Sequence, residues 1–479
     1  MLFRMIYDDT LAQAAYLIGC QRTGEAIVID PERDVDRYIK AAEREGLRIS
    51  AVTETHIHAD FLSGSRELAE KVGAKVYLSD EGDSEWKYRW LDKKSGGGSY
   101  EHRLVRAGDT FRVGNIEFQV LHTPGHTPEH ICFAITDRGG GAAEPMGIAT
   151  GDFVFVGDLG RPDLLETAAG KAGSKVPSAR RLYHSVQEFA KLADYLQVWP
   201  AHGSGSACGK ALGAVPQTTV GYEKRFNPSI RAATSEDYFV EFILEDQPDP
   251  PLYFPRMKRE NRDGPRILGA LPRPAAISSA ELKGLDGQRT AVIDTRTWKA
   301  FKAGHLPGAL YIPLDKSFPT VAGSFIEDTQ NIVVVADESR VEEAVRNLVR
   351  IGLDRVTGFV TPPVLEQYLG AGAKPATSED IDAAALHSRI DDPSLFLLDV
   401  RNASEFKQGH IPGALGAPYT RLASRLAELP KDKQIIVNCQ GGSRSARAVA
   451  FLERAGFKAT NLAGGFQAWE KEAAALVER

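Results

Sequence analysis

A pattern that occurs twice in the second half of the chain constrains the fold more than any other feature. Asp-x-Arg-x₄-Phe-x₂-Gly-His-x-Pro-Gly-Ala-Leu begins at Asp294 and begins again 105 residues later at Asp399. In each copy an apolar run precedes a polar loop, a second apolar run and a segment with amphipathic helical spacing. Because alternating strands and helices build a parallel sheet covered on both faces, the sequence predicts two successive α/β domains of ordinary size.

The second copy contains a candidate nucleophile. The loop Cys439-Gln-Gly-Gly-Ser-Arg444 follows an apolar run that ends at Asn438 and precedes a predicted helix from Ala446. Backbone N–H groups at a helix N-terminus, together with the charge of Arg444, stabilise a thiolate and bound sulfur oxyanions. A free cysteine is more often buried and inert, but the glycines and the arginine of this loop favour a reactive Cys439.

The first copy lacks these features. Alignment of the two copies places Ala336 at the position of Cys439, and the following loop, Asp337-Glu-Ser-Arg340, has no glycine and is one residue shorter. The two acidic side chains of that loop would also repel an anionic sulfur donor. We therefore expect the first copy to be an inactive spacer that packs the catalytic domains together or mediates oligomerisation.

The two copies resemble rhodanese domains, which are α/β sulfurtransferases. The six-residue loop from Cys439 to Arg444 has the length found in the sulfurtransferases of that family, whereas related phosphatases and arsenate reductases have a longer loop. The resemblance implies that Cys439 moves sulfane sulfur between thiosulfate and a thiol, with Arg444 beside it.

A second group of residues, in the first half of the chain, is of the kind that binds metal ions. His-x-His-x-Asp begins at His56, directly after a predicted strand, and histidine or aspartate recurs in three later loops. In this order the segments resemble the metal-binding loops of the metallo-β-lactamase superfamily, which implies an αββα fold over roughly the first 250 residues. The matching segments are Thr55-His56-Ile-His58-Ala-Asp60, Thr-Pro-Gly-His126, Thr-Gly-Asp152 and Pro-Ala-His202.

Phe61 stands where that superfamily normally has a histidine for a second metal ion. Since phenylalanine cannot ligate a metal, a site for one ion is favoured over a hydrolase that needs two. His56, His126 and Asp152 supply two imidazoles and one carboxylate, which suits a non-haem Fe(II) oxygenase, although zinc can bind the same ligands. The residues expected to orient the ligands or metal-bound water are His58, Asp60 and His202.

Together with Gly160-Arg-Pro-Asp163, these motifs resemble the persulfide dioxygenases, also called sulfur dioxygenases. The resemblance implies that one iron ion on the same three ligands oxidises a low-molecular-weight persulfide, usually glutathione persulfide, with O₂ and water to sulfite and the free thiol. Fused to a sulfurtransferase, such an enzyme would detoxify sulfide and persulfide. In the family the arginine of this motif lies near the thiol substrate, so Arg161 is a candidate for binding a carboxylate. Lys224 and Arg225 are further candidates.

Three other functions remain open. A thioesterase of the glyoxalase II type would share the first-half motifs and a glutathione substrate, but it would hold two metal ions, against which Phe61 argues. A true β-lactamase is disfavoured by the attached sulfurtransferase. A sulfur carrier or sensor without catalysis is disfavoured because all three proposed ligands are present.

Length and composition agree with three domains. We expect a metallo-β-lactamase-fold domain at 1–255, an inactive rhodanese-like domain at 266–372 and an active one at 377–479, with linkers near 247–274 and 370–375. No apolar run reaches the ~18 residues of a membrane span, and four cysteines without a C-x-x-C pair suit a reducing cytoplasm. A net charge of −6 gives no reason to expect nucleic acid. The expected partners are a thiol persulfide, thiosulfate, sulfite, O₂ and a second copy of the chain in a dimer.

Overall fold

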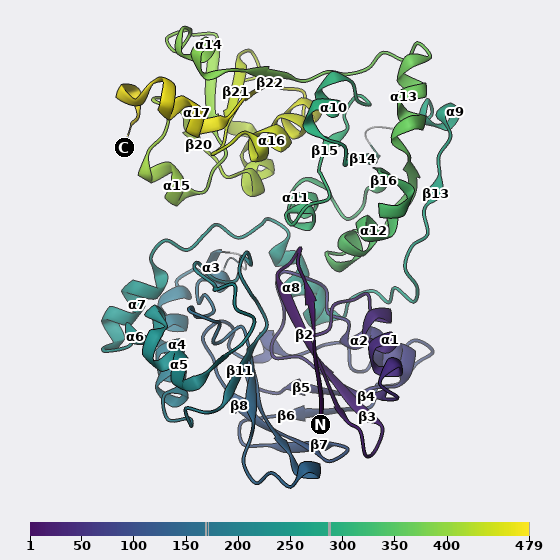
Figure 1. Ribbon diagram of the computed structural model, residues 1–479, viewed down its shortest axis with the longest axis vertical. Coiled ribbons are helices and arrows are strands. Elements are labelled where there is room, and N and C mark those ends of the chain that lie inside the picture. The colour runs from purple at the N-terminus through teal and green to yellow at the C-terminus, as the bar shows by residue number, and fades with distance from the viewer. Residues whose placement is uncertain (168–169, 171, 286–288, 479) are drawn as a thin grey trace. The chain divides into compact units, whose positions relative to one another are not determined.

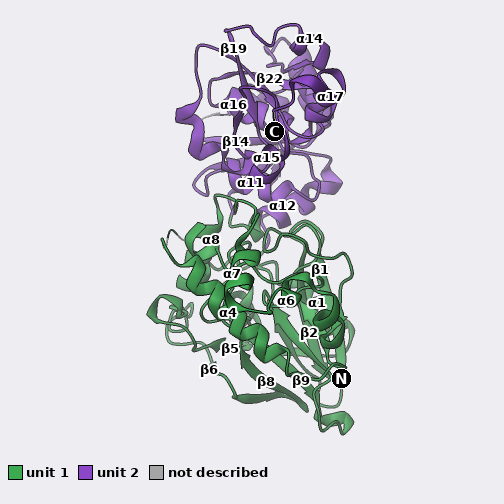
Figure 2. Ribbon diagram, turned by 90° about the vertical axis from the view of Figure 1, so that its left-hand side faces the viewer, with its two compact units in different colours: residues 1–270, 349–352 green, residues 271–348, 353–479 purple. Residues whose placement is uncertain are grey.

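The computed structural model describes residues 1–167, 170, 172–285 and 289–478. They form two units, one made of residues 1–270 and 349–352 and the other of residues 271–348 and 353–479 (Figure 2). Each unit contains two β-sheets. The first unit extends to Ala270, beyond the boundary at residue 255 expected from the sequence.

The first sheet of the first unit has six strands in sequence order. The first three strands are antiparallel, and β3 to β6 are parallel. The strands are β1 (Leu2–Asp8), β2 (Gln13–Cys20), β3 (Glu25–Ile29), β4 (Arg48–Thr53), β5 (Lys75–Ser79) and β6 (His102–Val105).

The second sheet also has six strands. Its neighbours are antiparallel except for β10 and β11, which are parallel. In spatial order the strands are β12 (Thr218–Thr219), β11 (Gln197–Pro200), β10 (Gly147–Gly151), β9 (Ile131–Asp137), β8 (Ile116–His122) and β7 (Thr110–Val113).

Eight α-helices accompany these sheets within the described residues of the first unit. Some begin at side-chain caps, for example α5 at Thr219 and α7 at Ser235, whose hydroxyls accept hydrogen bonds from first-turn N–H groups. The helices are α1 (Asp36–Arg44), α2 (Ser65–Val72), α3 (Leu164–Thr167), α4 (Lys175–Phe189), α5 (Val220–Phe226), α6 (Pro228–Arg231), α7 (Glu236–Leu244) and α8 (Phe254–Asp263).

The two sheets pack face to face, with helices on both outer faces (Figure 1). Every residue of β2 is buried because its alternate side chains enter different cores. Tyr16 packs with Phe118 and Phe133 between the sheets, whereas Leu17 faces the core that contains Tyr38 of α1. On the far side, residues of β9 and β10 pack against α4 and α7. This arrangement confirms the predicted αββα fold.

The second unit contains two five-stranded parallel sheets with the same strand order. The duplication predicted from the sequence is therefore confirmed as two α/β repeats. The first sheet is β13 (Ala275–Ala276), β17 (Val356–Val360), β16 (Asn331–Val335), β14 (Thr290–Asp294) and β15 (Leu310–Tyr311). The second is β18 (Glu379–Ile381), β22 (Lys458–Leu462), β21 (Gln434–Asn438), β19 (Leu395–Asp399) and β20 (Leu415–Gly416).

Helices flank both sheets. Those of the first repeat are α9 (Ser279–Leu282), α10 (Trp298–Ala303), α11 (Phe318–Phe325), α12 (Val341–Arg350) and α13 (Pro362–Gly370). Those of the second repeat are α14 (Ala383–His387), α15 (Ala403–Gln408), α16 (Ser443–Arg454) and α17 (Gly465–Glu472).

The two repeats pack closely through α16. Its Ala446 and Ala450 belong to the apolar core of the first repeat, and the ring of Phe451 stacks on Phe325 of α11 with centroids 4.4 Å apart. Arg447 of the same helix forms an ion pair with Asp315 of the first repeat. The helix that follows the candidate nucleophile is thus shared between the repeats.

The described part of the chain contains no helix with the length and apolar character needed to cross a membrane.

Candidate metal centre and candidate sulfur-transfer site

The three predicted metal ligands lie together at one edge of the sandwich. His56, His126 and Asp152 follow the ends of β4, β8 and β10, so the chain delivers each from a different loop. Their ligand atoms lie within 4.8 Å of one another. Nε2 of His56 is 3.9 Å, and Nε2 of His126 is 3.5 Å, from Oδ2 of Asp152.

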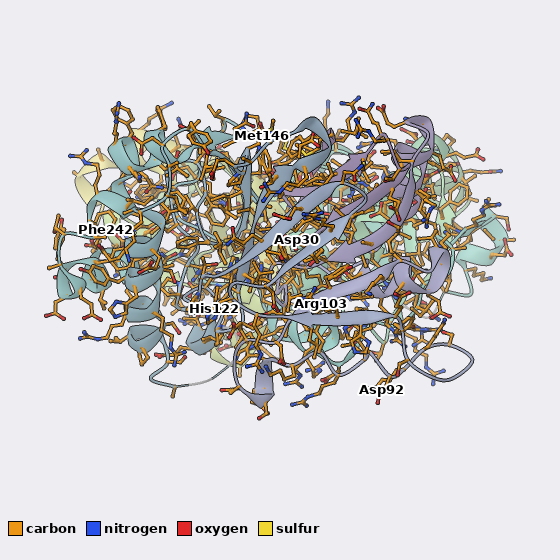
Figure 3. The ribbon with its side chains drawn as sticks, turned by 90° about the horizontal axis from the view of Figure 1, so that it is seen from below. Asp30, Asp92, Arg103, His122, Met146 and Phe242 are labelled. Atoms are coloured by element: carbon orange, nitrogen blue, oxygen red, sulfur yellow. The ribbon has the colours of Figure 1, made fainter. Side chains whose placement is uncertain are left out.

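The opposite nitrogen of each ligating histidine has a partner that sets its orientation. Nδ1 of His56 lies 3.0 Å from Oγ1 of Thr55, which in turn donates to the buried Asp30, labelled near the middle of the view in Figure 3. Nδ1 of His126 lies 3.0 Å from the carbonyl oxygen of Arg161. Such outer contacts leave Nε2 as the metal-binding atom. Burial lowers the pKa of His126 to about 4, so its imidazole is neutral at pH 7 and able to ligate.

The carboxylate of Asp152 is a buried group that needs a cation. It is 0 % exposed, and neither oxygen accepts a hydrogen bond from the residues that the structure describes. Burial raises the pKa of Asp152 to about 6, although the nearby His202 opposes this effect. Since buried polar atoms are almost always satisfied, two neutral imidazoles around this carboxylate fit a divalent metal ion.

Glycine is required on both sides of this aspartate. Gly151 has φ +52°, and a Cβ on it would lie 2.4 Å from Oγ1 of Thr55. A Cβ on Gly160 would lie 1.8 Å from the carbonyl oxygen of Asp152. The loops around the metal ligands therefore approach so closely that they exclude any side chain at these two positions.

A second group of possible ligands lies beside the first. Asp60, His202 and Cys208 are all buried, and their ligand atoms also lie within 4.8 Å of one another. Nε2 of His202 is 3.3 Å from Asp60 and 3.5 Å from Oδ1 of Asp152. Cys208 was not predicted from the sequence, because a single cysteine in a glycine-rich loop carries no motif.

Phe61 and His58 lie together next to this second group. Their rings pack with centroids 4.4 Å apart. Nε2 of His58 lies 3.1 Å from Asp30, while its Nδ1 has no hydrogen-bonding partner among the described residues. The structure thus places His58, like Asp60 and His202, at the border of the His56–His126–Asp152 group.

Arg161, which the sequence analysis names as a candidate for substrate binding, is buried and paired within the protein. Its guanidinium is 1 % exposed and forks onto Asp163 at 2.8 and 2.6 Å, and it also donates to the carbonyl oxygen of Ala207. The guanidinium of Arg161 is therefore paired with groups of the protein itself. Lys224 donates to Leu192 and Asp194 at the outer side of α5, and Arg225 is exposed there. These contacts do not bring either residue to the metal ligands.

A different cation lies near His126. Lys258 of α8, with Trp86, Phe254 and His126, lines a small cavity of about 20 Å³, and its ammonium lies 3.5 Å from the centre of the Trp86 ring. Lys258 was not predicted, because α8 lies inside the segment 247–274 that was expected to be a linker. The signal available was the proline at the second position of this helix, a common helix start.

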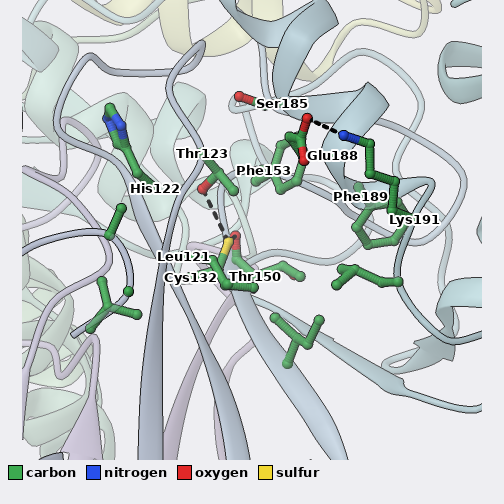
Figure 4. A pocket seen from close by; sticks show the side chains of 15 residues that line it. Leu121, His122, Thr123, Cys132, Thr150, Phe153, Ser185, Glu188, Phe189 and Lys191 are labelled. Atoms are coloured by element: carbon green, nitrogen blue, oxygen red, sulfur yellow. Dashed lines mark hydrogen bonds and ion pairs between the residues drawn. The ribbon is translucent and has the colours of Figure 1, made fainter. Parts of the chain in front are cut away.

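A larger cavity of about 310 Å³ lies on the α4 side of the second sheet (Figure 4). Figure 4 shows Thr123 and Cys132 pointing toward each other near its centre. Oγ1 of Thr123 lies 3.2 Å from Sγ of Cys132. Oγ1 of Thr123 also lies 2.8 Å from Nδ1 of His130, whose Nε2 accepts a hydrogen bond from the N–H of Asp152. His130 thus positions the loop of a metal ligand, a contact that its sequence context did not reveal.

Cys439 lies at the base of α16, as the loop pattern predicted. The helix begins at Ser443, three residues before the predicted start, so that Arg444 belongs to its first turn. The sulfur is buried and accepts a hydrogen bond from the N–H of Gly442 at 3.2 Å. Arg444 forks onto Glu405 with two contacts of 2.7 Å, which holds its guanidinium in one orientation.

The first repeat has Ala336 directly after β16, where the second repeat has Cys439 directly after β21. A short 3₁₀ turn, Glu338–Arg340, replaces the glycine loop. Arg340 of this turn pairs with Glu343.

Two family models match the chain. The model described as Metallo-beta-lactamase superfamily matches residues 8–202, and the model described as Rhodanese-like domain matches residues 278–361 and 382–472. A crystal structure of a metallo-beta-lactamase from Staphylococcus aureus is 41% identical with a TM-score of 0.67, and the match covers 76% of this chain and 99% of that one.

Two curated proteins extend the comparison. The Beta-lactamase hydrolase-like protein of Agrobacterium fabrum is 28% identical over 318 residues, which are 62% of this chain and 66% of that protein. The chain thus spans just under two thirds of that relative's length. A Sulfurtransferase of Allochromatium vinosum is 36% identical over 100 residues, which are 20% of this chain and 94% of that protein.

Proposed function

Because this chain belongs to the metallo-β-lactamase superfamily and continues into rhodanese-like domains, we propose that it oxidises a thiol persulfide at one iron ion and transfers sulfane sulfur at Cys439. The observation that carries the proposal is the group of His56, His126 and Asp152. Two imidazoles and one carboxylate are the ligand set that leaves adjacent positions open in non-haem Fe(II) oxygenases.

The overall reaction consumes a persulfide, one O₂ and one water, and releases a thiol, sulfite and two protons. The outer sulfur is oxidised, O₂ is reduced, and the S–S bond breaks. Iron, when bound, supplies the redox chemistry that joins dioxygen to sulfur. His56 and His126 bind the ion as neutral imidazoles, and Asp152 contributes the negative charge.

The low-molecular-weight thiol is glutathione or a carrier of similar charge. Lys258, at the cavity beside His126, is a further candidate, besides Arg161, for holding a substrate carboxylate. Trp86 and Phe254, the apolar neighbours of Lys258, line the same cavity.

At the second site, the thiolate of Cys439 attacks the outer sulfur of thiosulfate. The S–S bond breaks, sulfite leaves, and the cysteine persulfide passes its outer sulfur to an acceptor thiol. The N–H of Gly442 donates a hydrogen bond to the sulfur. Arg444, in the first turn of α16, adds a positive charge that stabilises the thiolate. Ala336 leaves the first repeat without a nucleophile, so we assign it no transfer chemistry.

Oxygen-electrode assays on iron-loaded protein with glutathione persulfide test the first activity. We expect the unaltered protein to take up O₂ and to bind about one iron per chain. The Asp152→Asn protein should lose both the O₂ uptake and the bound iron. Asp92→Asn is the matched control, since Asp92 is exposed at the periphery (Figure 3). Binding of two zinc ions per chain, with no O₂ uptake after iron loading, would refute the proposal.

One observation favours a second candidate, a thioester hydrolase of the glyoxalase II type with two zinc ions. Asp60, His202 and Cys208 offer donors for a second ion beside Asp152, although Phe61 removes the usual histidine. Hydrolysis of lactoylglutathione by the zinc form without O₂ would select this function.

A further inference from the structure

We propose that the first repeat, through Trp298 and Lys302, keeps the hydroxyl proton of Ser445 away from the sulfur of Cys439. A chain of hydrogen bonds carries this effect through Asp380 and Asn461. The first repeat thereby acts as a positioning element for the nucleophile of the second repeat, in addition to packing against it.

The chain of hydrogen bonds begins on α10 of the first repeat. Nε1 of Trp298 donates to Oδ1 of Asp380 at 2.9 Å, and Nζ of Lys302 donates to Oδ2 at 2.5 Å. Nδ2 of Asn461 also donates to Oδ1 of Asp380, at 3.0 Å. Burial raises the pKa of Asp380, but the bonds from Lys302, Asn461 and Trp298 outweigh burial and hold it below its usual value, so the group is a carboxylate at neutral pH.

A carboxylate only accepts hydrogen bonds, and this fact orients the rest of the chain. The amide nitrogen of Asn461 must face Asp380, so its amide oxygen faces Ser445. That oxygen accepts the hydroxyl proton of Ser445 at 2.6 Å. Oγ of Ser445 is also 3.4 Å from the sulfur of Cys439. Because a hydroxyl has only one proton to donate, Ser445 donates it to the amide oxygen of Asn461 and not to the sulfur.

Among the described residues, the N–H of Gly442 is therefore the donor of good geometry that the sulfur keeps. If Asp380 is removed, Asn461 is free to turn its NH₂ group toward Ser445. Ser445 then accepts from Asn461 and donates to the sulfur. Because a hydrogen bond to the thiolate favours the charged form, the thiol becomes more acidic.

Other charged and titratable groups surround this sulfur and stay unchanged in the experiments below. Arg444 is paired with Glu405, Arg401 with Asp399, and Arg447 with Asp315 of the first repeat, and Tyr419 is buried close by.

The test is the pH dependence of iodoacetamide alkylation of Cys439 in the full-length protein, followed on its peptide by mass spectrometry. Asp380→Ala should lower the thiol pKa by about one unit, as expected for one added bond to a charged group. Glu379→Ala removes an equal charge from the exposed neighbouring position and should leave the pKa unchanged. An unchanged thiol pKa in a folded Asp380→Ala protein would overturn the proposal.

A double-mutant cycle separates the hydrogen-bond chain from a simple charge effect. In a Ser445→Ala background, Asp380→Ala should no longer shift the thiol pKa, because no hydroxyl remains to change partner. A shift that persists without Ser445 contradicts the proposal.

The contribution of the first repeat is tested by Trp298→Phe combined with Lys302→Met. Freed from these donors, the half-buried Asp380 turns to water and releases Asn461, so the thiol pKa falls. Loss of the Lys302 cation alone would raise that pKa, so a rise or no change contradicts the proposal. Lys299→Met, at an exposed position of the same helix, is the control. This inference rests on the proposed role of Cys439. Because alkylation needs no sulfur substrate, the thiol pKa can be measured even in a protein without transferase activity. Failure of the proposed activity and failure of this inference therefore give different results.

Discussion

The buried carboxylate of Asp152 opposes folding of the metal-free protein near neutral pH. The pKa of Asp152 in the folded state is raised to about 6. The protonated carboxyl therefore contributes to folding stability at low pH, and this contribution is lost as the pH rises through that value. Asp152→Asn should therefore stabilise the metal-free protein by about 3 kcal/mol at pH 7 and by little at pH 4. Urea denaturation of chelator-treated protein at both pH values measures this difference. An equal effect at the two values would mean that the carboxyl titrates normally.

Gly151 is one of the two glycines that allow the ligand loops to approach each other closely. Gly151→Ala would combine an unfavourable positive φ with a clash against Thr55, and should cost on the order of 3 kcal/mol with loss of bound metal. Gly157 has a similar φ of +78° but open space around it. Gly157→Ala should therefore cost only about 1 kcal/mol and keep the metal. Denaturant unfolding and metal analysis of both variants make the comparison, and equal losses would contradict it.

The helix α8 is the element that closes the metal-ligand loop. The buried Asn261 donates to the carbonyl oxygens of His58 and Phe61 and accepts from the N–H of Ser63. Asn261→Ala leaves these backbone groups unsatisfied and should cost about 3 kcal/mol of folding stability. Arg259→Ala, on the exposed side of the same helix, should cost less than about 0.5 kcal/mol. Similar midpoints for the two variants in urea would show that α8 does not hold the loop.

The same helix carries the cation proposed to bind the substrate. Lys258→Met should raise the KM for glutathione persulfide about tenfold, equivalent to ~1.4 kcal/mol, with little change in kcat, because the contact is made equally before and during the reaction. Lys258→Arg should retain most of the affinity. Steady-state O₂ uptake measures both constants, and a fall in kcat alone would place Lys258 in the chemical step.

The elements that present the metal ligands could be predicted because their signals are local. Alternating or continuous apolar residues mark β4, β8 and β10, and each ligand follows a strand end. The helix α8 could not be predicted in this way, since its segment is rich in proline and charge and folds through buried contacts such as those of Asn261. The place of Cys208 beside Asp60 and His202, and the contact of Arg161 with the carbonyl oxygen of Ala207, depend on the meeting of distant loops, which no local pattern records.

At the scale of the whole molecule, the two proposed activities use residues of different units. The metal ligands lie in the first unit and Cys439 in the second. Cys439→Ser should therefore abolish transfer of sulfur from thiosulfate while leaving O₂ uptake with glutathione persulfide within about twofold of the unaltered protein, a difference of ~0.4 kcal/mol. Parallel assays on one preparation measure both. Loss of both activities would contradict independent sites.

The burial of α16 on all its sides has a consequence for the sulfur at its start. Residues 445–452 of this helix are buried without exception, because the first repeat covers the face that the second leaves open. Water and dissolved ions are thus kept from its peptide dipoles, and the surrounding medium has a low dielectric constant. The positive potential at the mouth of the Cys439 loop is accordingly screened less than it would be at the end of a helix on the surface, and it reaches farther toward an approaching anion.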